Sequence, residues 1–180
     1  RDRPAIAQIQ IEDKDSRSLI TTADAYVQDG AANTGRNFGT GSSLVVKKGT
    51  SGLNRETYLK FDLTSSGAIN NAKLRLFGQL NNVNQASLAV QVFASSGTSW
   101  TETGLTFTNK PATIGSALST QSIQGTVGRW YEWDVSTFLK AQKLAGQQFV
   151  TLVIRAQNVS DPVASFASRE TFNDPYLLIS

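Results

Sequence analysis

Residues 55–63 read RETYLKFDL, and this stretch decides the fold. Apolar and polar side chains alternate along it, with the period of an extended strand that buries one of its faces. Leu59 and Phe61 are then expected to point into a core, while Tyr58, Lys60 and Asp62 share the opposite face. The stretch therefore predicts a β-strand at the surface of a layered β protein.

The same alternation recurs along the chain in short runs separated by Gly, Asn, Ser and Thr. Such runs, with almost no helical period, indicate an all-β fold, a β-sandwich (jelly roll) of about nine antiparallel strands. One short helical turn is expected over residues 135–144, with Asp134 or Ser136 as its N-cap and Gly146 as its terminator. The strands are expected at 25–27, 43–48, 56–63, 68–77, 88–94, 128–134, 149–156, 163–168 and 176–179.

The remaining segments are an N-terminal stretch and two long loops. Residues 1–20 are rich in charge and alternate at 6–11, so they predict a linker or an extra N-terminal edge strand. The domain itself is expected over residues 21–180, a length that suits a single core. Polar loops are expected at 29–42 and 95–119, and loops of this kind often carry ligand-binding residues.

The residue types that are missing restrict the chemistry. The chain of 180 residues contains no Cys, Met or His, so it lacks a thiolate nucleophile and the commonest general base and transition-metal ligand. Its net charge is +3, and no cluster of Lys and Arg is longer than a pair, which is not typical of a nucleic-acid-binding protein. No run approaches the roughly 18 apolar residues of a membrane span. The first twenty residues lack the apolar core of a signal peptide, and we read the chain as a module excised from a longer one.

The face opposite the expected core is basic. Period-two alternation points Leu44 and Val46 toward the core in the same way, and likewise Leu74 and Leu76. If these strands belong to one sheet, its outer face presents Lys47, Tyr58, Lys60 and Arg75 together. A ring can stack on the apolar face of a sugar, while Lys and Arg pair with carboxylates. The alternative is that outward charges keep the sheet soluble, with Tyr58 a half-buried strand residue.

A series of motifs, in order along the chain, resembles a known family. The motifs are DAYV (24–27), NFG (37–39), LVVK (44–47), RETYLKFDL (55–63), AKLRL (72–76), SWTETGLTF (99–107), NKP (109–111), WYEWDV (130–135) and FASRE (166–170). The series resembles the DNRLRE-type domain, also classed as carbohydrate-binding module family 96, over residues 24–179.

The resemblance implies a β-sandwich appended to secreted polysaccharide-degrading enzymes or surface proteins. Characterised members of the family bind alginate, an acidic polymer whose carboxylates are engaged by basic residues of a groove. The matching positions in this chain are Lys47, Arg55, Lys60 and Arg75 with Tyr58 beside them, and Asn37 and Arg169 are further candidates.

Acidic residues and tryptophans are further candidates for a role in a site. Asp24 and Asp174 are expected as ligands of a structural Ca²⁺, because lectin-like sandwiches often hold this ion with carboxylates and carbonyls. The alternative is that they cap local turns. Trp133 is expected in the core and Trp100 as a structural plug in its loop, whereas the role of Trp130 stays open.

Three functions remain open at this point. The first is a secreted, non-catalytic module that holds an appended alginate lyase, or another polysaccharide-degrading enzyme, on an acidic polysaccharide such as alginate. It would be a monomer within a larger multidomain chain, with neither nucleic acid nor membrane as partner. The second is a structural or adhesion domain of a secreted surface protein. The third is a small lyase that uses Tyr58 and Arg55, and the absence of a His base disfavours it.

Overall fold

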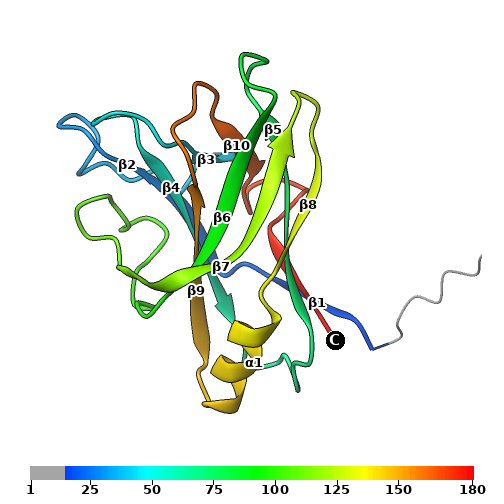
Figure 1. The fold of residues 1–180 in the computed structure, drawn as a ribbon. Coiled ribbons are helices and arrows are strands. Elements are labelled where there is room, and N and C mark those ends of the chain that lie inside the picture. The colour runs from blue at the N-terminus through cyan, green and yellow to red at the C-terminus, as the bar shows by residue number, and fades with distance from the viewer. Residues whose placement is uncertain (1–14) are drawn as a thin grey trace, which may run out of the picture.

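The computed structural model describes residues 15–180, which form two antiparallel β-sheets and one helix (Figure 1). The expected all-β sandwich is confirmed, with eleven strands in the described residues. The β4 sheet contains β2 (Ala23–Gln28), β4 (Arg55–Asp62), β6 (Ser87–Ser95), β7 (Thr113–Gln124) and β9 (Phe149–Ala156). The β5 sheet contains β1 (Arg17–Ile20), β3 (Ser43–Val46), β5 (Ala72–Leu80), β8 (Arg129–Asp134), β10 (Ala164–Ala167) and β11 (Tyr176–Ile179).

The long strand β5 organises its sheet. Strand β8 pairs with residues 73–78 of β5 along one edge. Along the other edge of β5, β11 pairs with residues 72–75 and β10 pairs with residues 78–80. Strand β1 then pairs with β11, and β3 pairs with β10. In the other sheet the order is β2-β4-β9-β6-β7. Every pairing is antiparallel, as expected for a sandwich of this class.

The core between the sheets follows the alternation of the sequence. The side chains expected to point inward are at most 1% exposed and belong to one cluster, namely Leu44, Val46, Leu59, Phe61, Leu74 and Leu76. Trp133 is completely buried in the same cluster. Removing this apolar surface from water is the main term that stabilises the sandwich.

A second apolar cluster lies on the outer side of the β4 sheet. The long loop 96–112, between β6 and β7, covers it. The members of this second cluster are Ala23, Ala25, Val27, Tyr58, Trp100, Leu105 and Val153. The outer face of the β4 sheet is therefore only partly open to solvent.

Two expectations about the strands need correction. Strands β3, β4 and β5 do not belong to one sheet, because β4 lies in the sheet opposite the other two. Residues 113–119 were expected in a loop but begin β7, an edge strand whose side chains are mostly exposed or half-buried on both faces. Because few of its residues are buried, β7 lacks the apolar alternation that marks the other strands.

The helix α1 (Ser136–Leu144) lies at one end of the sandwich (Figure 1). Its N-cap is Val135, so the expectation of Asp134 or Ser136 is wrong. The Asp134 carboxylate nevertheless accepts a hydrogen bond of 2.9 Å from the main-chain N–H of Ser136. Gly146 follows the helix with a φ of 75°, a conformation that glycine adopts without strain, and it ends the helix as expected.

The N-terminal segment is partly described. Strand β1, at the edge of the β5 sheet, falls within the stretch that predicted either a linker or an edge strand. The alternating stretch at 6–11 lies outside the described residues. Over residues 15–180, no helix is long and apolar enough to cross a membrane.

Candidate functional site

A cleft of about 350 Å³ opens on the outer face of the β4 sheet, beside the loop 96–112. We call it the basic cleft. Its lining comes from the β3–β4 connection, from the first two residues of β4, from β6, from the end of β9 and from the loop. The lining residues are Lys47, Lys48, Asn54, Arg55, Glu56, Gln91, Phe93, Phe107, Arg155, Ala156 and Gln157.

Charge in the basic cleft is strongly unbalanced. Four of its lining residues are Lys or Arg, and Glu56 is the one carboxylate among them. The Glu56 carboxylate already has two cationic partners: Arg155 Nε lies 3.0 Å from Oε1, and Lys110 Nζ lies 3.0 Å from Oε2. Because Glu56 is neutralised in this way, it does not offset the charge of the other basic residues.

The other three basic residues of the cleft bond to neutral groups. Lys47 Nζ donates to the carbonyl of Asp161 at 2.8 Å, and Lys48 Nζ donates to the carbonyl of Gln157 at 3.1 Å. Arg55 Nε donates to the side-chain oxygen of Gln28 at 3.0 Å. Within residues 15–180 none of these three cations forms an ion pair. They can therefore take up an anionic ligand without breaking an existing ion pair.

Main-chain pairing fixes two of these cations side by side. The N–H of Lys47 donates to the carbonyl of Arg55, and the N–H of Arg55 donates to the carbonyl of Lys47. Two phenylalanine rings add apolar surface to the cleft. The Arg155 guanidinium lies 5.3 Å from the ring centre of Phe93, and the Lys110 ammonium lies 4.7 Å from the ring centre of Phe107. The cleft thus combines positive charge with aromatic surface.

Two of the residues predicted for the site hold the loop 96–112 instead. Tyr58 is completely buried, and its hydroxyl donates to the carbonyl of Pro111 at 3.2 Å. The Lys60 ammonium donates to the carbonyl of Trp100 and lies 4.8 Å from the centre of its ring. Burial lowers the pKa of Lys60. Both side chains face out from the β4 sheet as the alternation predicted, but they point into the loop.

Arg75 lies on the opposite side of the molecule, on the β5 sheet. Its Nε is 3.0 Å from a carboxylate oxygen of Glu132, and its Nη1 donates to the hydroxyl of Tyr176 at 2.7 Å. The guanidinium also lies 5.4 Å from the ring centre of Trp130. The predicted face that joins Arg75 to Tyr58 and Lys60 therefore does not exist, because these residues are on different sheets.

Asn37 and Arg169 meet at a third place, around three acidic residues. We call Asp24, Glu102 and Glu170 the carboxylate cluster, because a carboxylate oxygen of each lies within 4.8 Å of the others. Asn37 Nδ2 donates to the carbonyl of Glu102 at 2.7 Å, and Arg169 Nη1 lies 3.2 Å from the Glu102 carboxylate. These two positions are thus engaged within the protein and lie outside the lining of the basic cleft.

Asp24 is the buried member of the carboxylate cluster. Its side chain is completely buried, and burial raises the pKa of Asp24 to about 7. One carboxylate oxygen accepts a hydrogen bond of 2.9 Å from the main-chain N–H of Arg169. Asp174, the other predicted metal ligand, is not part of this cluster.

Comparison with known proteins identifies the family. A family model described as carbohydrate-binding module family 96 matches residues 15–180. The chain belongs to this family. A curated gellan lyase from Bacillus sp is 31% identical over 167 residues, which are 89% of this chain and 6% of that protein. The chain therefore spans only a small part of this relative.

Three solved structures resemble the module at TM-scores below 0.5. The K1 cleaved adhesin domain of Lys-gingipain from Porphyromonas gingivalis W83 has a TM-score of 0.44 at 12% identity, covering 92% of this chain and 98% of that one. The K3 cleaved adhesin domain of the same protein gives 0.43 at 13% identity, covering 88% and 92%. The CBM36-1 domain of a xylanase from a Trinervitermes trinervoides hindgut metagenome gives 0.38 at 11% identity, covering 87% and 97%.

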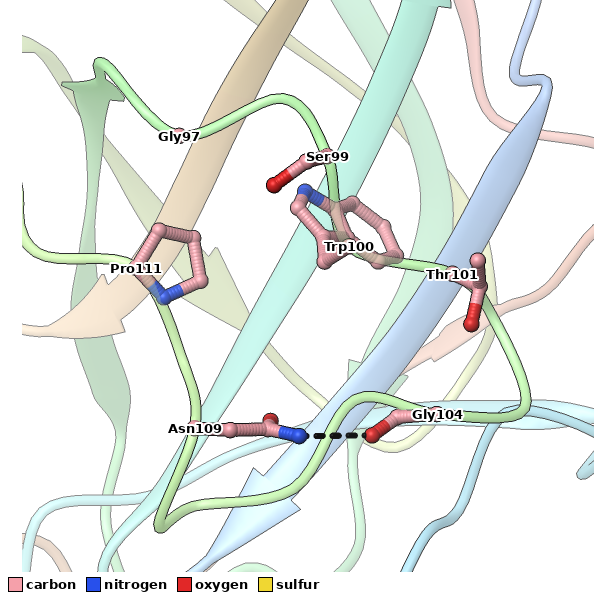
Figure 2. Close-up of a pocket in the computed structure, with 7 residues that line it drawn as sticks. All are labelled: Gly97, Ser99, Trp100, Thr101, Gly104, Asn109 and Pro111. Atoms are coloured by element: carbon pink, nitrogen blue, oxygen red, sulfur yellow. Dashed lines mark hydrogen bonds between the residues drawn. The ribbon is translucent and has the colours of Figure 1, made fainter.

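A second hollow of the module lies under the loop 96–112 (Figure 2) and is lined by Gly97, Ser99, Trp100, Thr101, Gly104, Asn109 and Pro111. The indole of Trp100 is 9% exposed and donates to the hydroxyl of Thr151 at 3.0 Å. Asn109 Nδ2 donates to the carbonyl of Gly104 at 2.9 Å and closes the loop on itself. Trp100 is therefore a structural plug, as predicted, and its ring is not free to stack on a sugar.

Four basic or aromatic residues of the basic cleft were not identified from the sequence: Lys48, Phe93, Phe107 and Arg155. Alternation within 88–94 and 149–156 places Phe93 and Arg155 on the outer face, so extending the face assignment to these strands would have found them. Phe107 comes from a loop, where side-chain direction has no fixed period. Its place in the cleft is visible only in the structure.

Proposed function

We propose that this family 96 module binds an acidic polysaccharide in the basic cleft and holds an appended polysaccharide lyase on that polymer. The observation that carries the proposal is the set of three cations, Lys47, Lys48 and Arg55, that have no carboxylate partner in the described part of the chain. The module itself acts without catalysis, outside the cell, as a monomeric part of a multidomain protein.

The chemistry of a uronic-acid polymer fits this cleft. Its sugar carboxylates accept charge-assisted hydrogen bonds from ammonium groups, and the planar guanidinium of Arg55 can bind a carboxylate through two N–H groups. The rings of Phe93 and Phe107 offer apolar surface for the C–H face of a sugar. The amides of Gln91 and Gln157 supply partners for hydroxyl groups.

Alginate is the polymer that we propose first, because the characterised family members that this sequence resembles bind it. Gellan is the second, since the curated relative is a gellan lyase. Lys48 is exposed and Lys47 and Arg55 are half-buried at the mouth of a cleft open to water, so each ion pair with a carboxylate is expected to contribute only about 0–1 kcal/mol. Affinity per site is therefore modest, and salt weakens it.

Affinity electrophoresis tests the class of ligand. The module would run through gels that contain alginate, gellan, pectate or a neutral glucan, at low and at high salt. We expect retardation by alginate, gellan or both, none by the neutral glucan, and loss of retardation at high salt. The variant Lys48→Ala should be retarded less, whereas Lys140→Ala removes the same charge from exposed α1 and should behave as wild type.

The alternative functions give different results in these gels. Retardation by the neutral glucan alone would refute the acidic ligand but leave a carbohydrate-binding module. Mobility that no polymer changes would favour a structural or adhesion domain. Release of unsaturated products from alginate or gellan, seen as ultraviolet absorbance, would contradict a non-catalytic module.

A further inference from the structure

We propose that the carboxylate cluster of Asp24, Glu102 and Glu170 is a Ca²⁺ site that fastens the loop 96–112 to the sandwich. This site is separate from the basic cleft and does not depend on the identity of the polysaccharide. Its three acidic residues come from strand β2, from the loop 96–112 and from the turn between β10 and β11.

The spacing of the three carboxylates fits one ion. A carboxylate oxygen of each residue lies within 4.8 Å of the other two. Ca²⁺ binds oxygen at about 2.3–2.6 Å, so two oxygens on opposite sides of one ion are up to about 5 Å apart. The three groups can thus reach a single ion with small side-chain movements.

A buried oxygen without a partner points to the same place. Asp24 is completely buried, and its Oδ2 accepts the N–H of Arg169. Its Oδ1 is buried too, yet within residues 15–180 it has no hydrogen-bond partner. Leaving a charged oxygen in this state is costly. A cation bound to Oδ1 would remove this cost.

The charge balance of the cluster calls for a divalent ion. Three carboxylates face one guanidinium, that of Arg169, which contacts Glu102. With all three ionised, this leaves a net charge of −2. The donors are all oxygens, which select a hard cation, and Ca²⁺ accepts irregular sets of six to eight oxygens more readily than Mg²⁺ does.

The surrounding contacts hold the cluster in place. Asn37 fixes the main chain at Glu102, and Gly39 lies so close that a Cβ there would be 1.9 Å from the Glu102 carbonyl oxygen. The Ser168 hydroxyl lies 2.6 Å from a carboxylate oxygen of Glu170. Three loops therefore meet at β2, and an ion at this point would tie them together.

The thermal midpoint of unfolding tests the site in the absence of any polysaccharide, since acidic polymers bind Ca²⁺ themselves. The protein, stripped with EDTA, would be titrated with CaCl₂ or with MgCl₂. At a hundredfold excess of Ca²⁺ over its dissociation constant, the wild-type midpoint should rise by about 5–10 °C. Mg²⁺ should raise it less.

Two variants and a control make the result specific. Asp24→Asn should lose the Ca²⁺-dependent rise and, in EDTA, should be at least as stable as wild type because it no longer buries an unpartnered charge. Glu170→Gln changes an exposed side chain, so it should fold normally and also lose most of the rise. The control Glu132→Gln removes a carboxylate of the β5 sheet and should keep the full rise.

Two results would overturn the proposal. One is a wild-type midpoint that Ca²⁺ does not change. The other is a rise that Asp24→Asn and Glu170→Gln both retain, since this would place the ion elsewhere. If Asp24→Asn is instead less stable than wild type in EDTA, the buried carboxylate is satisfied without metal and the proposal also fails.

Discussion

Replacing Trp100 with alanine tests how the loop 96–112 is held on the β4 sheet. The ring is 9% exposed, packs edge-on against Tyr58 at 6.3 Å, and lies under the Lys60 ammonium. Its indole N–H donates to the hydroxyl of Thr151, a group that is itself buried. The substitution removes all of these contacts at once and leaves a cavity between the loop and the sheet.

The expected cost follows from the size of the buried side chain. Truncating a buried Trp to Ala typically costs about 3–5 kcal/mol, and the contacts of Trp100 place it within this range. For a chain of this length each kcal/mol lowers the unfolding midpoint by about 2–4 °C, so we expect a fall of about 6–20 °C. Differential scanning calorimetry measures it directly. Because Phe107 and Lys110 belong to the same loop, affinity for acidic polysaccharide should fall as well.

Trp130→Ala is the matched control for this experiment. Trp130 is a partly exposed tryptophan on the β5 sheet, where it contacts Phe77 and Tyr176 through ring edges. It should lose less stability than Trp100→Ala and keep its affinity. A midpoint for Trp100→Ala within about 2–4 °C of wild type, or a larger effect in the control, would refute the structural role of Trp100.

Three further predictions concern single positions. Lys60→Met should lower the free energy of unfolding in urea by about 1.5–3 kcal/mol, because a charge-assisted hydrogen bond to the loop is lost. Its affinity for alginate should stay within about twofold of wild type. Gly39→Ala should cost about 1–3 kcal/mol through its clash with the neighbouring loop, whereas Gly35→Ala, with no atom within 4 Å of the new Cβ, should be close to neutral in the same assay. Hydrogen bonds from Thr64 lower the pKa of Asp62, so this group stabilises the fold above its unfolded pKa of about 3.9 and stops doing so as pH falls through the lower folded pKa. Asp62→Asn should therefore flatten the acid side of a plot of melting temperature against pH, and an unchanged acid side would contradict this reasoning.

The direction of side chains was predictable from the sequence, because period-two alternation is a local property of a strand. Leu59 and Phe61 point into the core as expected, and Lys60 points out. Membership of a sheet is not local, since it depends on which strands pair across long separations. Alternation therefore could not place Arg75 on the opposite sheet from Lys60.

The candidate sites show the same division between local and long-range information. Lys47 and Arg55 were both predicted, and both line the basic cleft. Arg155 lies on β9, which pairs with β4, and Phe93 lies on β6, which pairs with β9, so both reach the cleft only after folding. Likewise Asp24 was recognised as a candidate metal ligand, but Glu102 is 78 residues away and reaches it through the loop.

The most direct test of the account compares two double variants that each remove two positive charges. Lys47→Ala/Arg55→Ala alters the basic cleft, and Arg75→Ala/Arg129→Ala alters the opposite, β5 sheet. Calorimetric titration with alginate at low salt should show at least about tenfold weaker binding for the first variant, equal to about 1.4 kcal/mol, and at most about a twofold change for the second. Circular dichroism would confirm that both variants fold. Equal loss in both variants would mean that net charge alone drives binding, and a loss confined to the second would place the site on the β5 sheet and contradict the account.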